Sequence, residues 1–150
     1  MQIREYFSDR NRSHWLSQIG KSDWGGGSYL YEMLSNGTFF EFAGEEAKIL
    51  LLTEGDTLVS YCTFARLDDI KPTELTPWIG FVYTFPEFRG HRHVGKLMAH
   101  AEELARQDGK EYTYISTAHI GVYEKYGYEY YKDLPNVGGT VSRVYRKSIK

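Results

Sequence analysis

The segment from Ile79 to Gly109 constrains the fold of this chain more than any other part of the sequence. It opens with an apolar, aromatic and β-branched run, Ile79 to Phe85, that predicts a buried strand. A short loop follows, with Gly90 and several basic or titratable side chains. From Val94 onwards, apolar residues recur at the spacing of one helix face, and Gly109 stands where a helix commonly ends. The segment therefore predicts a strand, a tight loop and a helix in direct succession.

The junction between this loop and the helix has the features of an anion site. Backbone N–H groups without acceptors and the positive end of the helix dipole meet at a helix N-terminus. Arg89, Arg92 and Lys96 add positive charge at this point of the sequence. These features favour a ligand that carries phosphate.

Length, charge and cysteine content limit the classes of function. The 150 residues fit one domain, 1–150, that is large enough to bury a core. A net charge of −2 gives no general basic field, so we expect no nucleic-acid partner. We also expect no membrane partner, because no run reaches the length of a membrane span and the N-terminus lacks a signal-peptide pattern. Cys62 is the only cysteine, which excludes an intrachain disulfide and agrees with a cytoplasmic location.

Around the central segment, the pattern of apolar residues and turns predicts elements in the order β-α-α-β-β-β-α-β-α-β-β. The expected strands are Gln2–Phe7, Ala47–Thr53, Thr57–Ala65, Ile79–Phe85, Glu111–Thr117, Tyr128–Lys132 and Thr140–Lys147. The expected helices run from Ser8 or Asp9 to Ile19, from Tyr29 to Leu34, from Val94 to just before Gly109, and from Ile120 to Tyr126. The glycines at positions 25 to 27 are expected to form a flexible break between the first two helices.

Two motifs in the chain resemble those of the Gcn5-related N-acetyltransferases. The run P-E-F-R-G-H-R-H-V-G-K-L-M, Pro86 to Met98, resembles the family's P-E-Y-R-G-x-G-x-G-x-x-L-L loop, whose amides bind the pyrophosphate of coenzyme A. The run G-V-Y-E-K-Y-G-Y, Gly121 to Tyr128, resembles the family's F-Y-x-K-x-G-F signature. The resemblance implies an α/β fold in which helices flank a mixed, mostly antiparallel central sheet, with acetyl-CoA as cosubstrate.

The loop departs from the family pattern in two places, and its register stays open. Arg92 and Val94 replace the two later glycines of the motif. We favour the register in which Arg89 takes the motif arginine, because Leu97 and Met98 then fill the paired apolar positions. The alternative makes Arg92 the motif arginine. Residues other than glycine can still donate their amides to phosphate if their side chains point away.

The resemblance also implies roles for individual residues. In the family, main-chain groups of the strand hold the pantetheine arm, and the loop holds the phosphates. The matching positions here are Val82, Tyr83 and Thr84 for the strand, and Arg89, Gly90, His91, Arg92, His93, Val94, Gly95 and Lys96 for the loop. Tyr123 matches the family tyrosine whose hydroxyl protonates the leaving thiolate.

The sequence leaves the general base open. The run 78–85 contains no acid or histidine, and Glu74 precedes it at some distance. His119 lies beside the expected site, where its ordinary pKa of about 6.5 suits a base. The alternative, which we favour, is a loop histidine that makes a structural hydrogen bond. Glu32 and Glu41 are expected as solvated surface charges.

The acceptor and the assembly are also open. Trp24, Tyr29 to Tyr31 and Trp78 would either wall an amine pocket through cation–π contacts or simply pack the rim of the domain. The acceptor would be a small-molecule amine or a protein amine. An edge strand near the C-terminus leaves a homodimer open. We expect no metal site, because His91, His93 and His100 lack the spacing and further ligands of a zinc centre.

Three hypotheses of function follow. The favoured one is an acetyl-CoA-dependent N-acetyltransferase with direct attack of the amine in a ternary complex, since Cys62 lies inside an apolar strand and is a poor acetyl carrier. The alternative is a module that binds acyl-CoA without transferring the acyl group. A P-loop nucleotide enzyme is disfavoured because Gly90 and Gly95 are too close together, and Leu97 stands where Ser or Thr should hold Mg²⁺.

Overall fold

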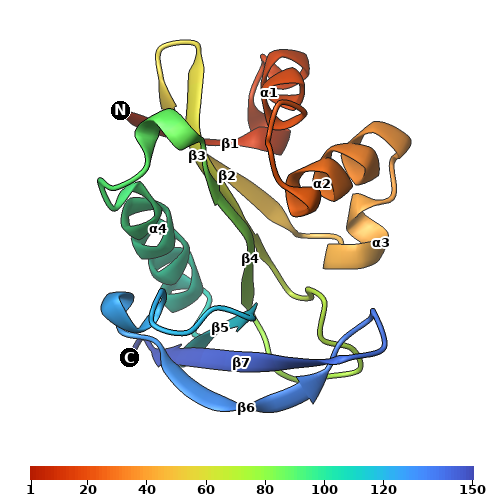
Figure 1. Cartoon of the computed structure of the whole chain (residues 1–150), viewed down its shortest axis with the longest axis vertical. Coiled ribbons are helices and arrows are strands. Elements are labelled where there is room, and N and C mark those ends of the chain that lie inside the picture. Colours follow the sequence, from red (N-terminus) through yellow and green to blue (C-terminus); the bar gives the residue numbers. More distant parts are fainter.

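A seven-stranded sheet runs through the computed structural model, which describes residues 1–150 (Figure 1). Its strands lie in the order β1-β2-β3-β4-β5-β7-β6, and β4 and β5 form the one parallel pair. The strands are β1 (Gln2–Glu5), β2 (Lys48–Glu54), β3 (Thr57–Ala65), β4 (Trp78–Thr84), β5 (Tyr112–Thr117), β6 (Glu129–Pro135) and β7 (Val141–Ser148). The α-helices are α1 (Arg12–Ile19), α2 (Gly25–Asn36), α3 (Phe39–Ala43) and α4 (His93–Gln107), and 3-10 turns occupy Tyr6–Ser8, Pro86–Phe88 and Glu124–Tyr126.

Helices cover both faces of the sheet. Helix α4 lies on one face and α1, α2 and α3 lie on the other (Figure 1). The middle of β2 is therefore buried on both sides, and its alternate residues enter different cores: Leu50 packs with α4, whereas Leu51 packs with α1 and α2. None of the helices combines the length and apolar character needed to cross a lipid bilayer.

The sheet opens between β4 and β5. β4 pairs with β3 along most of its length, but its only register pair with β5 is Trp78 with Tyr114. The register of β3 and β4 also shifts around Cys62, opposite Phe81, whose φ of 47° is unusual for a bulky residue. Beyond Trp78, the backbone groups on the free edge of β4 consequently have no strand partner. Such a gap at the carboxyl ends of parallel strands is a common place for a ligand.

The structure confirms the predicted fold class and the central strand, loop and helix. The helix ends as expected, because Gly109 has a φ of 75° and its N–H donates to the Arg106 carbonyl at 2.9 Å. The hairpin of β2 and β3 also forms, with Gly55 in its turn. The strand next to the C-terminal strand, β6, is an edge strand.

Two local predictions near the N-terminus are wrong. The glycines at positions 25 to 27 do not form a flexible break, because they are the first turn of α2. Tertiary packing explains this: a Cβ at Gly27 would lie 2.7 Å from the hydroxyl oxygen of Tyr61, so a close contact with β3 requires glycine there. The helix expected from Ser8 or Asp9 begins only at Arg12.

Two further corrections concern helices. A short helix that the pattern did not predict, α3, follows α2. The helix expected from Ile120 to Tyr126 is only a 3-10 turn, Glu124–Tyr126, although Gly127 closes it as predicted with a φ of 95°. The order of elements therefore differs at these two places, while the sheet and the arrangement of the larger helices agree with the expected fold class.

Candidate functional site

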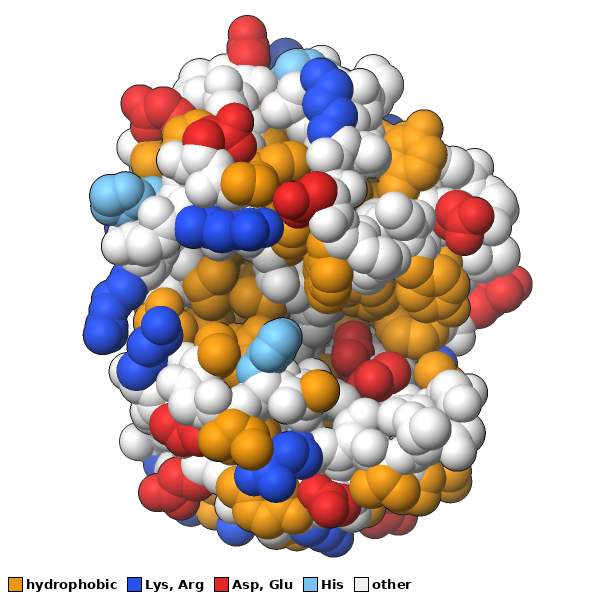
Figure 2. All heavy atoms as spheres, in the orientation of Figure 1, with side chains coloured by type: hydrophobic (Ala, Val, Ile, Leu, Met, Phe, Trp, Pro, Cys, Tyr) orange, Lys and Arg blue, Asp and Glu red, His pale blue; other side chains and the backbone are white.

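A cavity of about 1100 Å³ occupies the opening between β4 and β5. The strands, the loop before α4, the segment around Tyr123 and the N-terminus of α2 all contribute to its wall. Figure 2 shows this hollow across the face of the molecule, with Lys and Arg side chains toward one end and acidic side chains within the other. The cavity therefore has a basic end at α4 and an acidic end near the loop that leads into β4.

The basic end is built from the loop and the first residues of α4. None of the backbone N–H groups from Gly90 to Val94 donates to an acceptor within the chain. Gly90 and Arg92 both have positive φ, 89° and 56°, which turns the loop tightly into the helix. This arrangement presents several free N–H groups at a helix N-terminus, which is a suitable geometry for binding a diphosphate.

His93 adds an unpaired polar atom to this end. Its side chain lines the cavity, and its buried Nδ1 has no hydrogen-bond partner in the chain. Burial and the nearby Lys96 and His91 lower the pKa of His93, which favours the neutral ring near neutral pH. A neutral imidazole can donate one hydrogen bond to a phosphate oxygen.

The structure brings most of the sequence-predicted cofactor residues to the cavity, but not all of them. Its wall includes Val82, Tyr83, Thr84, Arg89, Gly90, Arg92, His93 and Val94. His91, Gly95 and Lys96 do not line it. A Cβ at Gly95 would lie 3.0 Å from the Tyr126 ring, so this glycine allows α4 to pack against an aromatic side chain.

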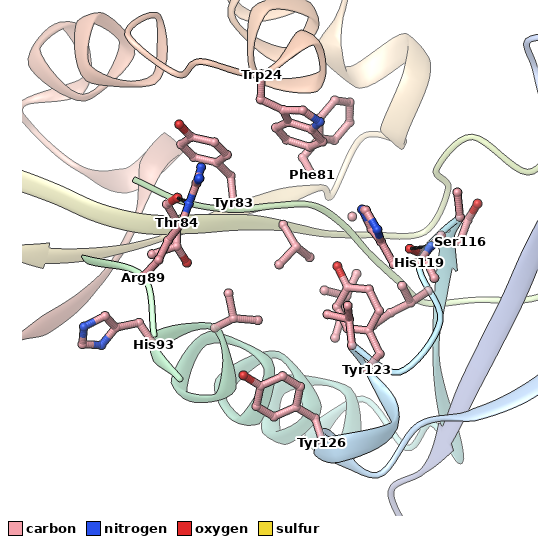
Figure 3. A pocket seen from close by; sticks show the side chains of 18 of the residues that line it. Trp24, Phe81, Tyr83, Thr84, Arg89, His93, Ser116, His119, Tyr123 and Tyr126 are labelled. Carbon is pink, nitrogen blue, oxygen red and sulfur yellow. Dashed lines mark hydrogen bonds between the residues drawn. The ribbon is translucent and has the colours of Figure 1, made fainter. Parts of the chain in front are cut away.

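Arg89 turns away from the free amides. Its Nε donates to the Thr84 carbonyl at 2.9 Å, and its guanidinium forms a 3.4 Å ion pair with Asp23. Figure 3 shows Arg89 extended toward Tyr83, whose ring centroid lies 5.5 Å from its Cζ. In this conformation Arg89 connects the loop to the N-terminal side of α2, whereas Arg92 stays at the basic end of the cavity.

The predicted strand residues combine main-chain and side-chain roles. The Tyr83 carbonyl accepts a hydrogen bond from Ser60 Oγ at 2.6 Å, which fixes β4 to β3. The Tyr83 hydroxyl donates to the Asp23 carboxylate, and the Asp23 N–H donates back to it at 3.1 Å. Desolvation and the Asp23 carboxylate raise the pKa of Tyr83. The hydroxyl therefore stays protonated and holds the start of α2 over the cavity.

Tyr123 projects into the middle of the cavity. Figure 3 shows its hydroxyl directed into the space between β4 and the segment that carries Tyr123. Burial raises the pKa of this hydroxyl to about 12. Cys62 lies nearby in the same core cluster, but it is completely buried and does not line the cavity. Burial also raises the pKa of its thiol to about 12, so Cys62 stays protonated and inaccessible.

Of the candidate bases from the sequence, only His119 reaches the cavity. It is exposed, it lines the wall, and its backbone N–H donates to Thr117 Oγ1 at 3.0 Å. Glu74 is exposed and does not line the cavity. Glu32 and Glu41 are exposed on α2 and α3, as expected.

Three aspartates in or beside the cavity wall have no counterpart in the sequence-based prediction, and two of them, Asp68 and Asp69, form its acidic end. Asp23 and Asp69 line the cavity, and Asp68 is buried beside Asp69. Two adjacent acids in a polar connection normally lie in solvent, so the pattern around them gives no sign of burial. The only sequence signal is Gly80, which leaves room for Asp68 because a Cβ there would overlap its Oδ1.

An aromatic wall faces these acids. Trp24 stacks on Tyr83 with ring centroids 5.7 Å apart, and Phe81 packs edge-on against Trp24 (Figure 3). Tyr29 lies beside Phe81 with centroids 6.3 Å apart and remains exposed. Trp78 is not part of this wall, because it is buried and its Nε1 donates to the Leu75 carbonyl at 2.7 Å.

Comparisons with known proteins agree with this geometry. The family model described as the acetyltransferase (GNAT) domain matches residues 38–131. A GNAT-family protein from Desulfovibrio desulfuricans has the same fold, with a TM-score of 0.71, 16% identity and 99% of each chain covered. The aminoglycoside 6′-N-acetyltransferase from Enterococcus faecium gives a TM-score of 0.69 at 16% identity, covering 100% of this chain and 98% of its own. An aminoglycoside 6′-N-acetyltransferase in complex with coenzyme A gives 0.67 at 15% identity with the same coverage. A comparison with curated protein sequences finds no match.

Proposed function

The chain belongs to the Gcn5-related N-acetyltransferase (GNAT) family of acetyltransferases, and on that premise we propose that it transfers an acetyl group from acetyl-CoA to a small-molecule primary amine. The single observation that carries the proposal is the cavity that joins two different ends. One end offers free amides to a diphosphate, and the other offers carboxylates and aromatic rings to an amine.

The residues present fit acetyl-CoA. The N–H groups from Gly90 to Val94 would hold the diphosphate, with Arg92 and His93 beside it. The unpaired edge of β4 around Val82 would hydrogen-bond the amides of the pantetheine arm, as an added strand does. Acetyl-CoA supplies an activated acyl group as a thioester.

Tyr123 would act on the leaving sulfur. Its pKa of about 12 keeps the hydroxyl protonated, so it can donate a hydrogen bond as negative charge develops on the thiolate. A thiol has an ordinary pKa near 8.5. Stabilisation of the thiolate by this hydrogen bond is therefore more favourable than complete proton transfer from the phenol. The burial of Cys62 supports direct attack by the amine over an acetyl-enzyme intermediate.

The acceptor end favours a cationic amine. Trp24 and Phe81 provide aromatic faces, and Asp69 provides negative charge, whereas the Asp23 carboxylate is already engaged by Tyr83 and Arg89. The aminoglycoside 6′-N-acetyltransferases that share the fold are named for acceptors with several amino groups. We therefore propose an acceptor that carries a primary amine and has no carboxylate next to it.

Release of free thiol from acetyl-CoA tests this function. We would measure it with a thiol-reactive dye at pH 8 for kanamycin A, spermidine, tyramine and tyrosine, and identify each product by mass spectrometry. Thiol release with an acetylated product for at least one cationic amine, and none for tyrosine, is expected. Tight coenzyme A binding without release for any amine would instead indicate a module that only binds acyl-CoA.

A further inference from the structure

Two adjacent aspartates, Asp68 and Asp69, lie at the acidic end of the cavity in the loop between β3 and β4. The loop is fixed on its other side, because the Asp69 carbonyl accepts a hydrogen bond from the Val137 N–H at 2.8 Å and Ile70 bridges to Asn136. The pair is thus held by backbone contacts to the β6–β7 hairpin.

Asp68 and Asp69 lack the cationic partner that buried carboxylates usually have. Asp68 is only 8% exposed, and Asp69 Oδ1 is buried and accepts no hydrogen bond from the chain. Neither side chain forms a salt bridge. Lys71 is the other charged group that acts on Asp68, but its Nζ donates to the Phe42 carbonyl at 2.7 Å. A carboxylate in a cavity wall that has an unpaired buried oxygen and no cationic partner points to a cationic ligand.

β4 is shaped to accommodate this pair. Asp68 Oδ1 lies directly over Gly80, and a Cβ on that residue would overlap it. Gly80 and Asp69 are both part of the cavity wall that also contains Tyr123. Figure 2 shows acidic side chains within the hollow, at the end away from the basic rim. A group bound at the pair would therefore share one cavity with the tyrosine assigned to the leaving sulfur.

We propose that Asp69, paired with Asp68, binds the ammonium group of the acceptor and is the general base that deprotonates it. The inference rests on the proposed N-acetyl transfer and adds the residue that this reaction needs on the amine side. Asp69 meets the ligand directly, and Asp68 acts through it as a positioning residue. His119 is the other candidate, but it is exposed, and its side chain carries no negative charge that would hold an ammonium ion.

The proton balance of this step is simple. One ammonium proton moves to the Asp69 carboxylate, and the free nitrogen pair forms the C–N bond to the thioester carbon. The C–S bond then breaks with its electron pair on sulfur. The nitrogen loses its second proton as the amide forms, and the thiolate takes up one proton to become the thiol. The proton held by Asp69 finally returns to solvent, so one proton is released for each acetyl group transferred.

Burial and the neighbouring carboxylate raise the pKa of Asp68 to about 7, so Asp68 in the empty pair holds a proton in part of the molecules near neutral pH. An ammonium ion bound to the pair would expel this proton. Binding should therefore release protons even when no acetyl-CoA is present. This gives a readout that does not depend on turnover.

The first experiment is calorimetry of amine binding without acetyl-CoA. Kanamycin A, spermidine and tyramine would be titrated at pH 7 in phosphate and in Mops, whose ionisation enthalpies differ and neither of which contains a primary amine. A binding enthalpy that changes with the buffer, showing release of a fraction of one proton per bound amine, is expected for the wild type.

Asp69→Asn should weaken binding at least about tenfold and remove the buffer dependence. Asp68→Asn should keep binding but release no proton. The matched control, Asp108→Asn at the exposed end of α4, should resemble the wild type.

The second experiment compares the kcat/KM of wild type and Asp69→Asn from pH 6 to 9, using the panel amine that the wild type acetylates fastest. Loss of a general base should lower kcat/KM about 10²-fold at pH 7. The deficit should narrow toward pH 9, because solvent then supplies the free amine. Coenzyme A affinity of the variant should match the wild type, because Asp69 lies outside the loop that would hold the diphosphate. A melting temperature near that of the wild type would show that the variant remains folded.

The outcomes separate the two proposals. An active wild type with an Asp69→Asn variant of equal kcat/KM, equal pH profile and equal proton release would overturn the inference and leave the proposed function intact. A deficit that is the same at every pH would indicate a structural role and would also overturn it. A wild type that neither binds nor acetylates any panel amine would contradict the proposed function, and the inference would fail with it.

Discussion

The Tyr123 hydroxyl is the group whose chemistry depends most on where the chain places it. Burial raises its pKa to about 12, and the neighbouring thiol of Cys62 and phenol of Tyr126 act in the same direction. The hydroxyl is consequently a donor near neutral pH. It lies in the cavity wall, where a leaving thiolate would need one.

We predict that Tyr123→Phe lowers kcat about 10²-fold, because only the donor to the leaving sulfur is lost. The dissociation constant of coenzyme A should not change, since the ring remains in place. Steady-state kinetics and calorimetry measure the two quantities. Tyr112→Phe, on β5 outside the cavity wall, is the matched control and should keep the wild-type kcat. Unchanged turnover in Tyr123→Phe would argue against the role given to this hydroxyl.

Asp68 makes stability depend on pH in the opposite sense from an ordinary surface aspartate. Its pKa rises from 3.8 to about 7 on folding, so between these values the native state holds a proton that the unfolded state releases. Its contribution is complete below pH 4 and is lost as the pH rises toward 7. The loss is up to about 1.4 kcal/mol of unfolding free energy per pH unit in this window.

Asp68→Asn should therefore gain stability relative to the wild type as the pH rises from 4.5 to 7.5. Urea unfolding at several pH values measures the difference. Taking this difference between the two proteins cancels His93, whose lowered pKa acts in the opposite direction. A difference that stays constant with pH would contradict the raised pKa of Asp68.

At the scale of elements, the start of α4 explains why a glycine-rich loop is common in the family. Arg92 is the N-cap of α4 and has a φ of 56°, a conformation that glycine adopts without strain. With Arg92 in place of the motif glycine, the loop keeps its turn and its free amides, but the backbone at this residue is strained. It also places a guanidinium at the basic end of the cavity, with its Cζ 5.9 Å from the centre of the Tyr126 ring.

Arg92→Gly should relieve the backbone strain, and this gain should exceed the cost of the larger entropy that glycine has in the unfolded chain. The net stabilisation of the fold should be up to about 1 kcal/mol. The same variant should bind coenzyme A more weakly, since one positive charge is lost beside the diphosphate. Thermal unfolding and calorimetry measure the two effects. His91→Gly, one position earlier and without a positive φ, should give no gain in stability. An equal gain in both variants would argue against strain at Arg92.

An ion pair between a buried glutamate and a partly exposed lysine joins α4 to the second half of the sheet. Glu102 on α4 is 4% exposed, accepts a hydrogen bond from the Tyr128 hydroxyl at 3.1 Å, and pairs with Lys147 of β7 at 2.8 Å. We predict that Lys147→Met lowers the unfolding free energy by about 3 kcal/mol, because a buried carboxylate then loses its cation. Chemical unfolding measures this. Lys150→Met removes an exposed pair with Glu111 and should cost less than about 0.5 kcal/mol. Equal losses in the two variants would contradict the prediction.

The parts of the fold that the sequence predicts are those set by local periodicity. The run from Ile79 and the apolar spacing from Val94 lie on β4 and α4, and the Tyr123 segment lies beside them as the resemblance implies. Helix α2 is different: it begins with glycines, because the contact with Tyr61 leaves no room for a side chain at Gly27. Such a contact between distant parts of the chain leaves no local pattern.

The same limit applies to the acidic end of the site. Asp69 reaches the cavity because the β3–β4 loop is held by backbone bonds to the hairpin of β6 and β7. Its burial depends on residues far along the chain, so two adjacent aspartates look like a solvated turn in the sequence. The ion pair between Arg89 and Asp23 likewise joins residues far apart in the sequence, so no local pattern predicts it.

At the scale of the whole molecule, the cavity exists because the sheet is divided. Strands β1 to β4 lie between two layers of helices, with α4 on one face and α1, α2 and α3 on the other (Figure 1). β5, β7 and β6 turn away from them after a single register pair between β4 and β5. The proposed donor end belongs to the β4–α4 unit, and the proposed acceptor end lies between α2 and the β3–β4 loop. The two substrates would therefore enter from different sides and meet near Tyr123.

A crystal structure of the protein with coenzyme A tests this arrangement most directly. We predict a diphosphate on the N–H groups from Gly90 to Val94, a pantetheine arm along the free edge of β4, and a sulfur atom within hydrogen-bond distance of the Tyr123 hydroxyl. Coenzyme A bound with its diphosphate away from this loop, or with its sulfur on the far side of β4 from Tyr123, would contradict the account.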